Sequence, residues 1–354
     1  MSYGAKICYN YSMNIFKRKD DKKTEQEKVE ERREEVLAAG RKFKYPLQWT
    51  KHRIVINTVL IVLIVLAVMV VGGWFALYRL NMTDDLLFRI TKIFPVPVAY
   101  VDSSEVRFSD YLMLYRSSIT SIERQSTTQF EEGSIDELRN EYKRAALTDA
   151  ESYSYAAKIA QEKDITVSDE EIKAEFDRHL KIGGIERSED SFMKIVGENF
   201  GLNKDEYERM IYLSLIKSKV EIAMDAQANR IAEQVESILA SNDNNYMEVN
   251  EQLGNNIIYE ETGGLVNSTN IDGGRATEAM KLEPGQSSGK FISMNGDGYY
   301  FVKLNKKTDS EVNFVSIKVP FTEFEKQFTK LKEDNKINEL IEINDSSTIE
   351  QPAD

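Results

Sequence analysis

The feature that most constrains this chain is an uncharged run of 24 residues from Ile54 to Leu77. A helix of that length, rising 1.5 Å per residue, crosses a hydrocarbon core of about 30 Å. Trp74 and Tyr78 stand where aromatic side chains anchor a helix at the membrane interface. A cleaved signal peptide fits poorly because the run is long and begins 53 residues into the chain, and a soluble helix would carry a polar face. We therefore predict a single transmembrane helix over residues 54–78.

The charges that flank this run predict its orientation. Several basic residues precede it, and Arg79 follows it shortly before Asp84 and Asp85; the preceding ones are Arg41, Lys42, Lys44, Lys51 and Arg53. Lys and Arg concentrate on the cytoplasmic side of membrane helices. We expect a signal anchor in the cytoplasmic (plasma) membrane, with the N-terminus in the cytoplasm and the C-terminal domains extracytoplasmic.

Composition excludes several classes of function. The chain has a net charge of −13, of which residues 1–53 carry +6 and the remainder −19. An acidic body disfavours nucleic-acid binding, because a phosphate backbone requires a basic surface. A single cysteine, Cys8, cannot form an intramolecular disulfide, and the two histidines, His52 and His179, supply little for metal binding or Cys/His catalysis. We expect no metal and no small-molecule cofactor.

Changes in composition divide the chain into five predicted parts. They are a charged cytoplasmic tail at 1–53, a transmembrane helix at 54–78, a helical domain at 82–225, an α+β domain at 226–343 and a disordered tail at 344–354. The predicted fold class is therefore mostly α with a C-terminal α+β domain, which contains a small sheet flanked by helices.

The helical domain has clear start and stop signals. Short β-type runs at 98–101 and 106–108 precede a helix that we expect Ser109 to cap. Residues 135–163 predict one long helix or two shorter ones, and Gly201 predicts the end of a later helix. Two capping boxes, in which a polar residue and a glutamate three positions later satisfy each other's backbone N–H groups, are formed by Ser168 with Glu171 and Asn203 with Glu206.

The C-terminal part has the turn chemistry of a small sheet. The turn sequence NGDG at 295–298 separates β-type runs at 289–293 and 299–304, which predicts a hairpin. A further β-type run covers 312–319, and the apolar spacing after it predicts a helix over 321–341.

Residues 98–225 resemble the helical domain of the SurA/PrsA type of membrane-anchored or secreted folding factor. The resemblance is carried by the strand, turn and helix at 98–112, by KDITVSDEEIKAEF at 163–176, and by FGLNKDEYERMIYLSLIKSKV at 200–220. It implies a helical chaperone domain that binds unfolded or extended polypeptides.

Residues 228–304 resemble a parvulin-type prolyl isomerase domain. The matching segments are GGL at 263–265, AMKLEPGQSS at 279–288 and GYYFVKL at 298–304. The family's first strand and its histidine are missing before residue 228, and the run at 312–319 is a candidate replacement for that strand in the same sheet.

The resemblance also implies where a catalytic site would lie. The histidine of the family's last strand aligns with Tyr300, its acid or thiol position falls near Asn256, and its pocket aromatic falls near Arg275. Tyr300 and Asn256 are therefore the candidate catalytic residues. Since neither supplies an ionisable acid or base near neutral pH, we expect isomerase activity to be weak or absent.

These observations favour a membrane-anchored extracytoplasmic chaperone for unfolded or newly translocated proteins, because Tyr, Phe and Met side chains repack around varied sequences. Two alternatives stay open. One is an active peptidyl-prolyl cis-trans isomerase with an atypical pocket. The other is a structural component of a cell-envelope complex, in which the charged tail of this chain at 20–39 contacts a cytoplasmic partner.

Overall fold

The computed structural model describes residues 24–44, 46–125 and 132–343, and it divides into two compact units at Gly72/Gly73. The predicted tail at 344–354 and residues 1–23 of the predicted charged tail lie outside the described residues. The first unit contains helix α1 (Glu25–Lys44) and most of helix α2 (Pro46–Tyr78). Within α2, residues Arg53–Tyr78 have a mean hydropathy of 3.2. The described chain buries none of their apolar window, which makes α2 a candidate membrane span.

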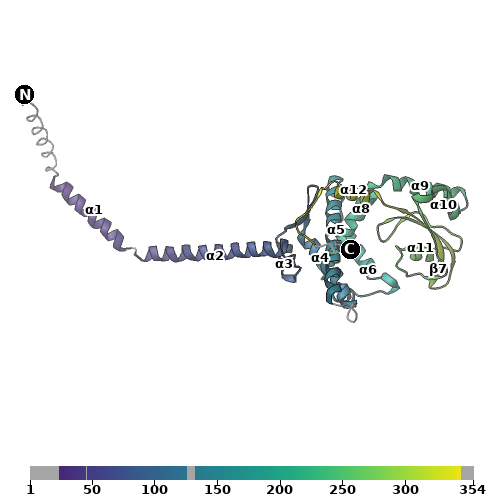
Figure 1. The fold of residues 1–354 in the computed structure, drawn as a ribbon, viewed down its shortest axis with the longest axis horizontal. Coiled ribbons are helices and arrows are strands. Elements are labelled where there is room, and N and C mark those ends of the chain that lie inside the picture. The colour runs from purple at the N-terminus through teal and green to yellow at the C-terminus, as the bar shows by residue number, and fades with distance from the viewer. Residues whose placement is uncertain (1–23, 45, 126–131, 344–354) are drawn as a thin grey trace, which may run out of the picture. The chain divides into compact units, whose positions relative to one another are not determined.

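The second unit begins with a helical domain (Figure 1). Its core includes the long helix α5, the helices α4 and α8 that pack against it, and the strand pair β1–β2. The elements are α3 (Asp85–Ile93), β1 (Pro97–Val101), β2 (Ser104–Arg107), α4 (Phe108–Gln125), α5 (Glu132–Glu162), α6 (Asp169–His179), the 3₁₀ turn η2 (Ile182–Gly184), α7 (Glu189–Phe200) and α8 (Lys204–Met224).

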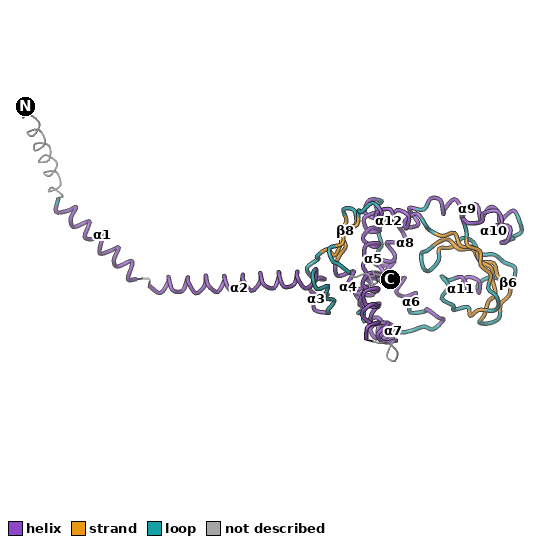
Figure 2. The backbone as a smooth tube through the Cα atoms, viewed as in Figure 1, coloured by secondary structure: helices purple, strands orange, loops and turns teal. Residues whose placement is uncertain are grey.

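The chain then forms a five-stranded sheet with helices on both faces, in which the path β3-β7-β6-β5 is antiparallel and β4 also pairs with β7 (Figure 2). The elements are α9 (Ala226–Ser241), α10 (Tyr246–Leu253), the 3₁₀ turn η3 (Gly254–Asn256), β3 (Ile258–Glu261), β4 (Val266–Asn267), α11 (Arg275–Met280), β5 (Phe291–Ile292), β6 (Gly298–Lys307) and β7 (Glu311–Pro320).

Alternation along the central strands decides which helices cover which face of this sheet. Successive side chains of a strand point to opposite faces. Phe301 and Ile317 accordingly pack with α9 and α10, whereas Val302 and Phe314 pack with α11. The predicted hairpin around 295–298 is confirmed by the antiparallel pairing of β5 with β6.

The run at 312–319 inserts into this sheet, as the sequence predicted, because β7 lies between β3 and β6. It pairs with β6 over the whole of its length. That it replaces a parvulin strand stays a prediction.

The last part of the described chain returns to the helical domain. Helix α12 (Glu323–Glu333) packs on α8, and strand β8 (Ile337–Glu339) pairs with β1. The prediction of a helix over 321–341 is therefore wrong beyond residue 333. Asn335 adopts a positive φ of 54° that ends the helix, and the following residues extend along the free edge of β1.

The local signals in the helical domain are mostly confirmed. Both capping boxes form, with Ser168 and Asn203 each accepting from the glutamate backbone N–H three residues on, and α5 is one continuous helix. Gly201 ends α7 with φ 64°. The predicted Ser109 cap is wrong, because α4 already begins at Phe108, whose N–H donates to Val96 O at 2.9 Å.

Candidate functional site

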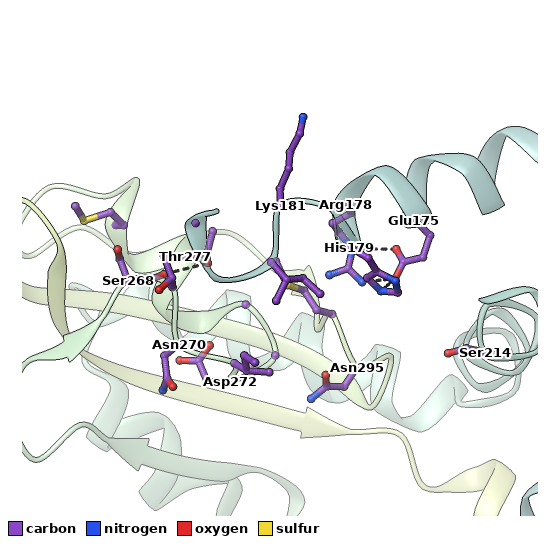
Figure 3. Close-up of a pocket in the computed structure, with 18 of the residues that line it drawn as sticks. Glu175, Arg178, His179, Lys181, Ser214, Ser268, Asn270, Asp272, Thr277 and Asn295 are labelled. Carbon is purple, nitrogen blue, oxygen red and sulfur yellow. Dashed lines mark hydrogen bonds and ion pairs between the residues drawn. The ribbon is translucent and has the colours of Figure 1, made fainter. Parts of the chain in front are cut away.

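A cleft of about 790 Å³ separates the helical domain from loops of the sheet domain (Figure 3). One wall comes from α6, η2 and α8. The other comes from residues 268–274, the adjoining α11 and the β5–β6 turn at 294–295. Its volume lies within the range of about 300–1,000 Å³ that is usual for ligand pockets.

A histidine network stiffens the helical wall. His179 Nδ1 lies 2.8 Å from the Tyr207 hydroxyl, and its Nε2 lies 3.1 Å from Glu175 Oε1. Burial raises the pKa of Tyr207 to about 12, so the hydroxyl that lies against the His179 ring stays protonated. Because both ring nitrogens are engaged, His179 orients the wall and is not free to activate a serine such as Ser214.

Glu175 carries the charge of this network. Its carboxylate also pairs with Arg178 on the same helix. Burial opposes ionisation of Glu175, but hydrogen bonds from His179 and Arg178 outweigh it and lower its pKa to about 2. The wall therefore presents a neutralised, fully paired polar cluster to the cleft.

The facing loop is held from inside the sheet domain. Thr277 Oγ1 donates to Ser268 O at 3.2 Å, and Arg275 Nε donates to Asp272 O at 2.9 Å. Met294 N donates to Gly273 O at 2.9 Å, which ties the loop to the β5–β6 turn. These bonds hold the loop in place from its own side of the cleft.

Two glycines allow the walls to approach each other. Gly184 has φ 71°, and a Cβ there would lie 2.7 Å from Thr269 Cγ2. Gly296 has φ 70°, and a Cβ there would lie 2.6 Å from Ser218 Oγ of α8. Both positions combine a left-handed backbone with a contact too short for a side chain.

Between these polar supports the cleft exposes apolar side chains. Ile271 is 83% exposed, Met294 is 47% exposed and Ile182 is 38% exposed, and all three line the cleft. Leu215 and Met280 add partly buried apolar surface. Glu175, Arg178 and His179 are paired with one another, while Ile271 and Met294 are exposed, so the cleft is suited to apolar groups of a flexible ligand.

Tyr300, the first of the predicted catalytic residues, lies beneath the cleft and outside its lining. It is 4% exposed and stacks on Phe291 with ring centroids 6.0 Å apart. Arg275 and Lys318 lie over its ring at 5.4 and 5.7 Å from the centroid. Burial raises the pKa of the Tyr300 phenol.

Asn256, the second predicted catalytic residue, lies apart from Tyr300. Its Nδ2 donates to Leu253 O at 2.9 Å, and its side chain is exposed at the end of η3. In register, Tyr300 pairs with Lys318 and Lys318 pairs with Ile258, so two strand spacings of about 10 Å in all separate β3 from Tyr300.

The sequence did not single out the cleft residues. His179 lies in the last turn of α6, a position that the apolar spacing of this helix does not mark as part of a cleft. Ile271 and Met294 belong to glycine-rich turns whose local pattern predicts loops only. Among the described residues, no group of three or more His, Cys, Asp or Glu side chains is placed to hold a metal ion.

Comparison with known proteins assigns the helical part of the chain. Residues 47–221 match the family model of the SurA-like N-terminal domain, which extends from the start of α2 to near the end of α8. No curated protein matches the chain. The helical part of the chain therefore contains a SurA-like N-terminal domain.

Proposed function

We propose that this protein is a membrane-anchored chaperone that binds unfolded or newly translocated polypeptides on the outer side of the cytoplasmic membrane. The cleft between the helical and sheet domains is the observation that carries the proposal. The SurA-like N-terminal domain and the apolar helix α2 support it.

The chemistry of the cleft favours extended polypeptides of varied sequence as ligands. Met280 and Met294 are unbranched and polarizable, so they adapt to differently shaped side chains. The aliphatic groups Ile182, Ile271 and Leu215 supply apolar surface without directional demands. Since the charged groups of the helical wall are paired internally, the cleft does not require a fixed charge on its ligand.

The apolar helix and its flanking charges support the proposed location. Basic residues precede the span, whereas the part after it is acidic, which matches the usual cytoplasmic bias of Lys and Arg. An anchored chaperone would meet its clients as they emerge from the membrane.

The sheet domain then contributes a wall of the cleft, and we expect little or no isomerase activity from it. Rotation about a prolyl bond must cross about 18–20 kcal/mol, and lowering that barrier requires donors placed at the twisted amide. Tyr300 is packed under the loop, and Asn256 is exposed on the far side of two strand spacings. Their separation argues against the two side chains acting together on one prolyl bond.

The test is whether the full chain in lipid nanodiscs suppresses aggregation of a client. The client is a denatured soluble protein that aggregates on dilution, and light scattering measures its aggregation. Met294→Asp places a charge in the cleft. Met247→Asp is the matched control, because Met247 on α10 is also 47% exposed but does not line the cleft. We expect the Met294 variant to need several-fold more protein for half-suppression, and the control to match the native chain.

Two outcomes would contradict the proposal. Equal suppression by the Met294 and Met247 variants would remove the cleft as the client site, and lack of suppression by the native chain would remove the chaperone function. Deleting residues 20–39 separates this function from the structural-component alternative, since the deletion should leave suppression intact.

A further inference from the structure

Helix α3, which follows the apolar helix α2 after a short turn, exposes an apolar face that the described chain does not cover. Leu86 is 70% exposed, Ile90 is 43% exposed and Ile93 is 73% exposed. Phe94, directly after the helix, is 66% exposed. Large apolar side chains grouped in this way mark an interaction surface, whereas isolated ones need no explanation.

The spacing of residues gives α3 three distinct faces. Positions 86, 90 and 93 fall within about 60° of each other at 100° per residue. The neighbouring face, which holds Leu87, Phe88 and Thr91, is buried in the helical domain. The third face is charged and contains Asp85, Arg89 and Lys92, of which Arg89 has a 76% exposed side chain. The helix therefore needs a second apolar environment beside its protein contact.

The end of α2 belongs to the same packed core as α3. Leu77 is 6% exposed, and the Tyr78 hydroxyl donates to Pro97 O at 2.6 Å. The Tyr78 ring lies 5.8 Å from that of Phe108 in an edge-to-face contact. The helical domain is thus built directly onto the last turn of α2 without a flexible linker.

The chain also turns back immediately after α2. Leu80 N donates to Phe75 O at 3.1 Å, and Met82 N donates to Ala76 O at 3.1 Å. Asn81 makes the turn with φ 47°. Residues 79–84 therefore stay beside the last turns of α2, and α3 starts next to the end of the apolar segment.

We propose that the exposed face of α3, with Phe94, lies in the interfacial layer of the same bilayer that α2 crosses. The occupant of this surface is lipid, because continuity with the apolar helix holds the face at the depth where that helix leaves the hydrocarbon. Interfacial helices combine an apolar face with adjacent basic side chains that reach the headgroups. Arg89, which pairs with Asp85 but keeps a 76% exposed side chain, supplies such a side chain here. This inference rests on the anchoring role of α2 in the proposed function.

A depth measurement on the full chain tests the inference. In a Cys8→Ser background, single cysteines replacing Ile90, Met247 and Val62 are spin-labelled, and the chain is reconstituted in vesicles of phosphatidylcholine and phosphatidylglycerol. Collision with oxygen, which enters lipid, is compared with collision with a water-soluble nickel chelate. We expect the oxygen-to-nickel ratio to be several-fold higher at position 90 than at position 247, and highest at position 62 in the middle of α2.

Each other outcome overturns a defined part of the argument. A water-like ratio at position 90 with a lipid-like ratio at position 62 would refute the role of α3 and leave the anchor standing. Water-like ratios at both positions would refute the anchor as well. Spin–spin broadening at position 90 that disappears on dilution with unlabelled protein would show that a second copy of the chain covers the face instead.

Discussion

Replacing the buried Glu151 by Gln is expected to stabilise the helical domain at alkaline pH. Glu151 on α5 is 1% exposed, and its Oε1 has no hydrogen-bond partner among the described residues. Burial and, to a smaller extent, the nearby Glu339 raise the pKa of this carboxyl to about 7, against the opposing effect of Lys332 and Arg144. Glutamine keeps the shape of the side chain and removes the ionisation.

The size of the effect follows from the shift in pKa. In the unfolded chain the same carboxyl has a pKa near 4.5, so above that pH the unfolded state has released a proton that the folded state still holds. The contribution of Glu151 to stability is therefore greatest below pH 4.5, falls as the pH rises to about 7, and is constant above that. The free-energy difference between the two limits is about 3 kcal/mol, at 1.36 kcal/mol for each tenfold change.

The assay is thermal unfolding of the full chain in detergent micelles, followed by far-ultraviolet circular dichroism at pH 5 and pH 8. With about 2–4 °C per kcal/mol for a domain of this size, Glu151→Gln should raise the midpoint by up to about 10 °C at pH 8 and by much less at pH 5. Glu141→Gln, an exposed change on the same helix, is the control. Equal shifts at both pH values, or destabilisation at pH 8, would refute the reasoning.

Three further predictions concern the contacts between the helical and sheet domains and the sheet domain itself. Asp225 accepts hydrogen bonds from Ala228 N at the start of α9 and from Thr322 N before α12. Asp225→Ala should therefore lower the free energy of unfolding by about 2 kcal/mol, measured by urea denaturation, and Asp225→Asn should lower it by less. Gly296→Ala should cost about 1–2 kcal/mol in the same assay, because its Cβ meets Ser218, and Ser218→Gly should restore part of the loss. Tyr300→Phe should leave turnover of a proline-containing peptide unchanged; a clear loss would favour the isomerase alternative.

Short-range signals in the sequence predicted much of the helical domain. Capping boxes, a C-terminal glycine and apolar residues spaced by four act within one or two turns, so their local chemistry determines the outcome. The apolar helix over 54–77 and the insertion of 312–319 into the sheet were predicted for related reasons. The first depends on length and the absence of charge, and the second on a β-branched run that follows a hairpin.

Long-range contacts account for what the sequence did not reveal. The return of residues 337–339 to β1 depends on an edge strand more than 230 residues earlier, which local periodicity cannot register. The cleft likewise combines α6 and α8 with loops of the sheet domain, and its apolar residues lie in turns whose pattern signals only a change of direction. The two predicted catalytic positions came from a resemblance to a parvulin sheet, and the packing around Tyr300 does not expose that residue to the cleft.

The pairing of β8 with β1 has a consequence for how the protein is made. Synthesis delivers β1 before the sheet domain, whereas Ile341 and Ile343, which pack in the same core as β1, come more than 230 residues later. During synthesis the edge of β1 that β8 covers therefore stays open while residues 226–336 are produced. A chain that stops before residue 337 would leave β1 without its second neighbour and the helical core without Ile341 and Ile343.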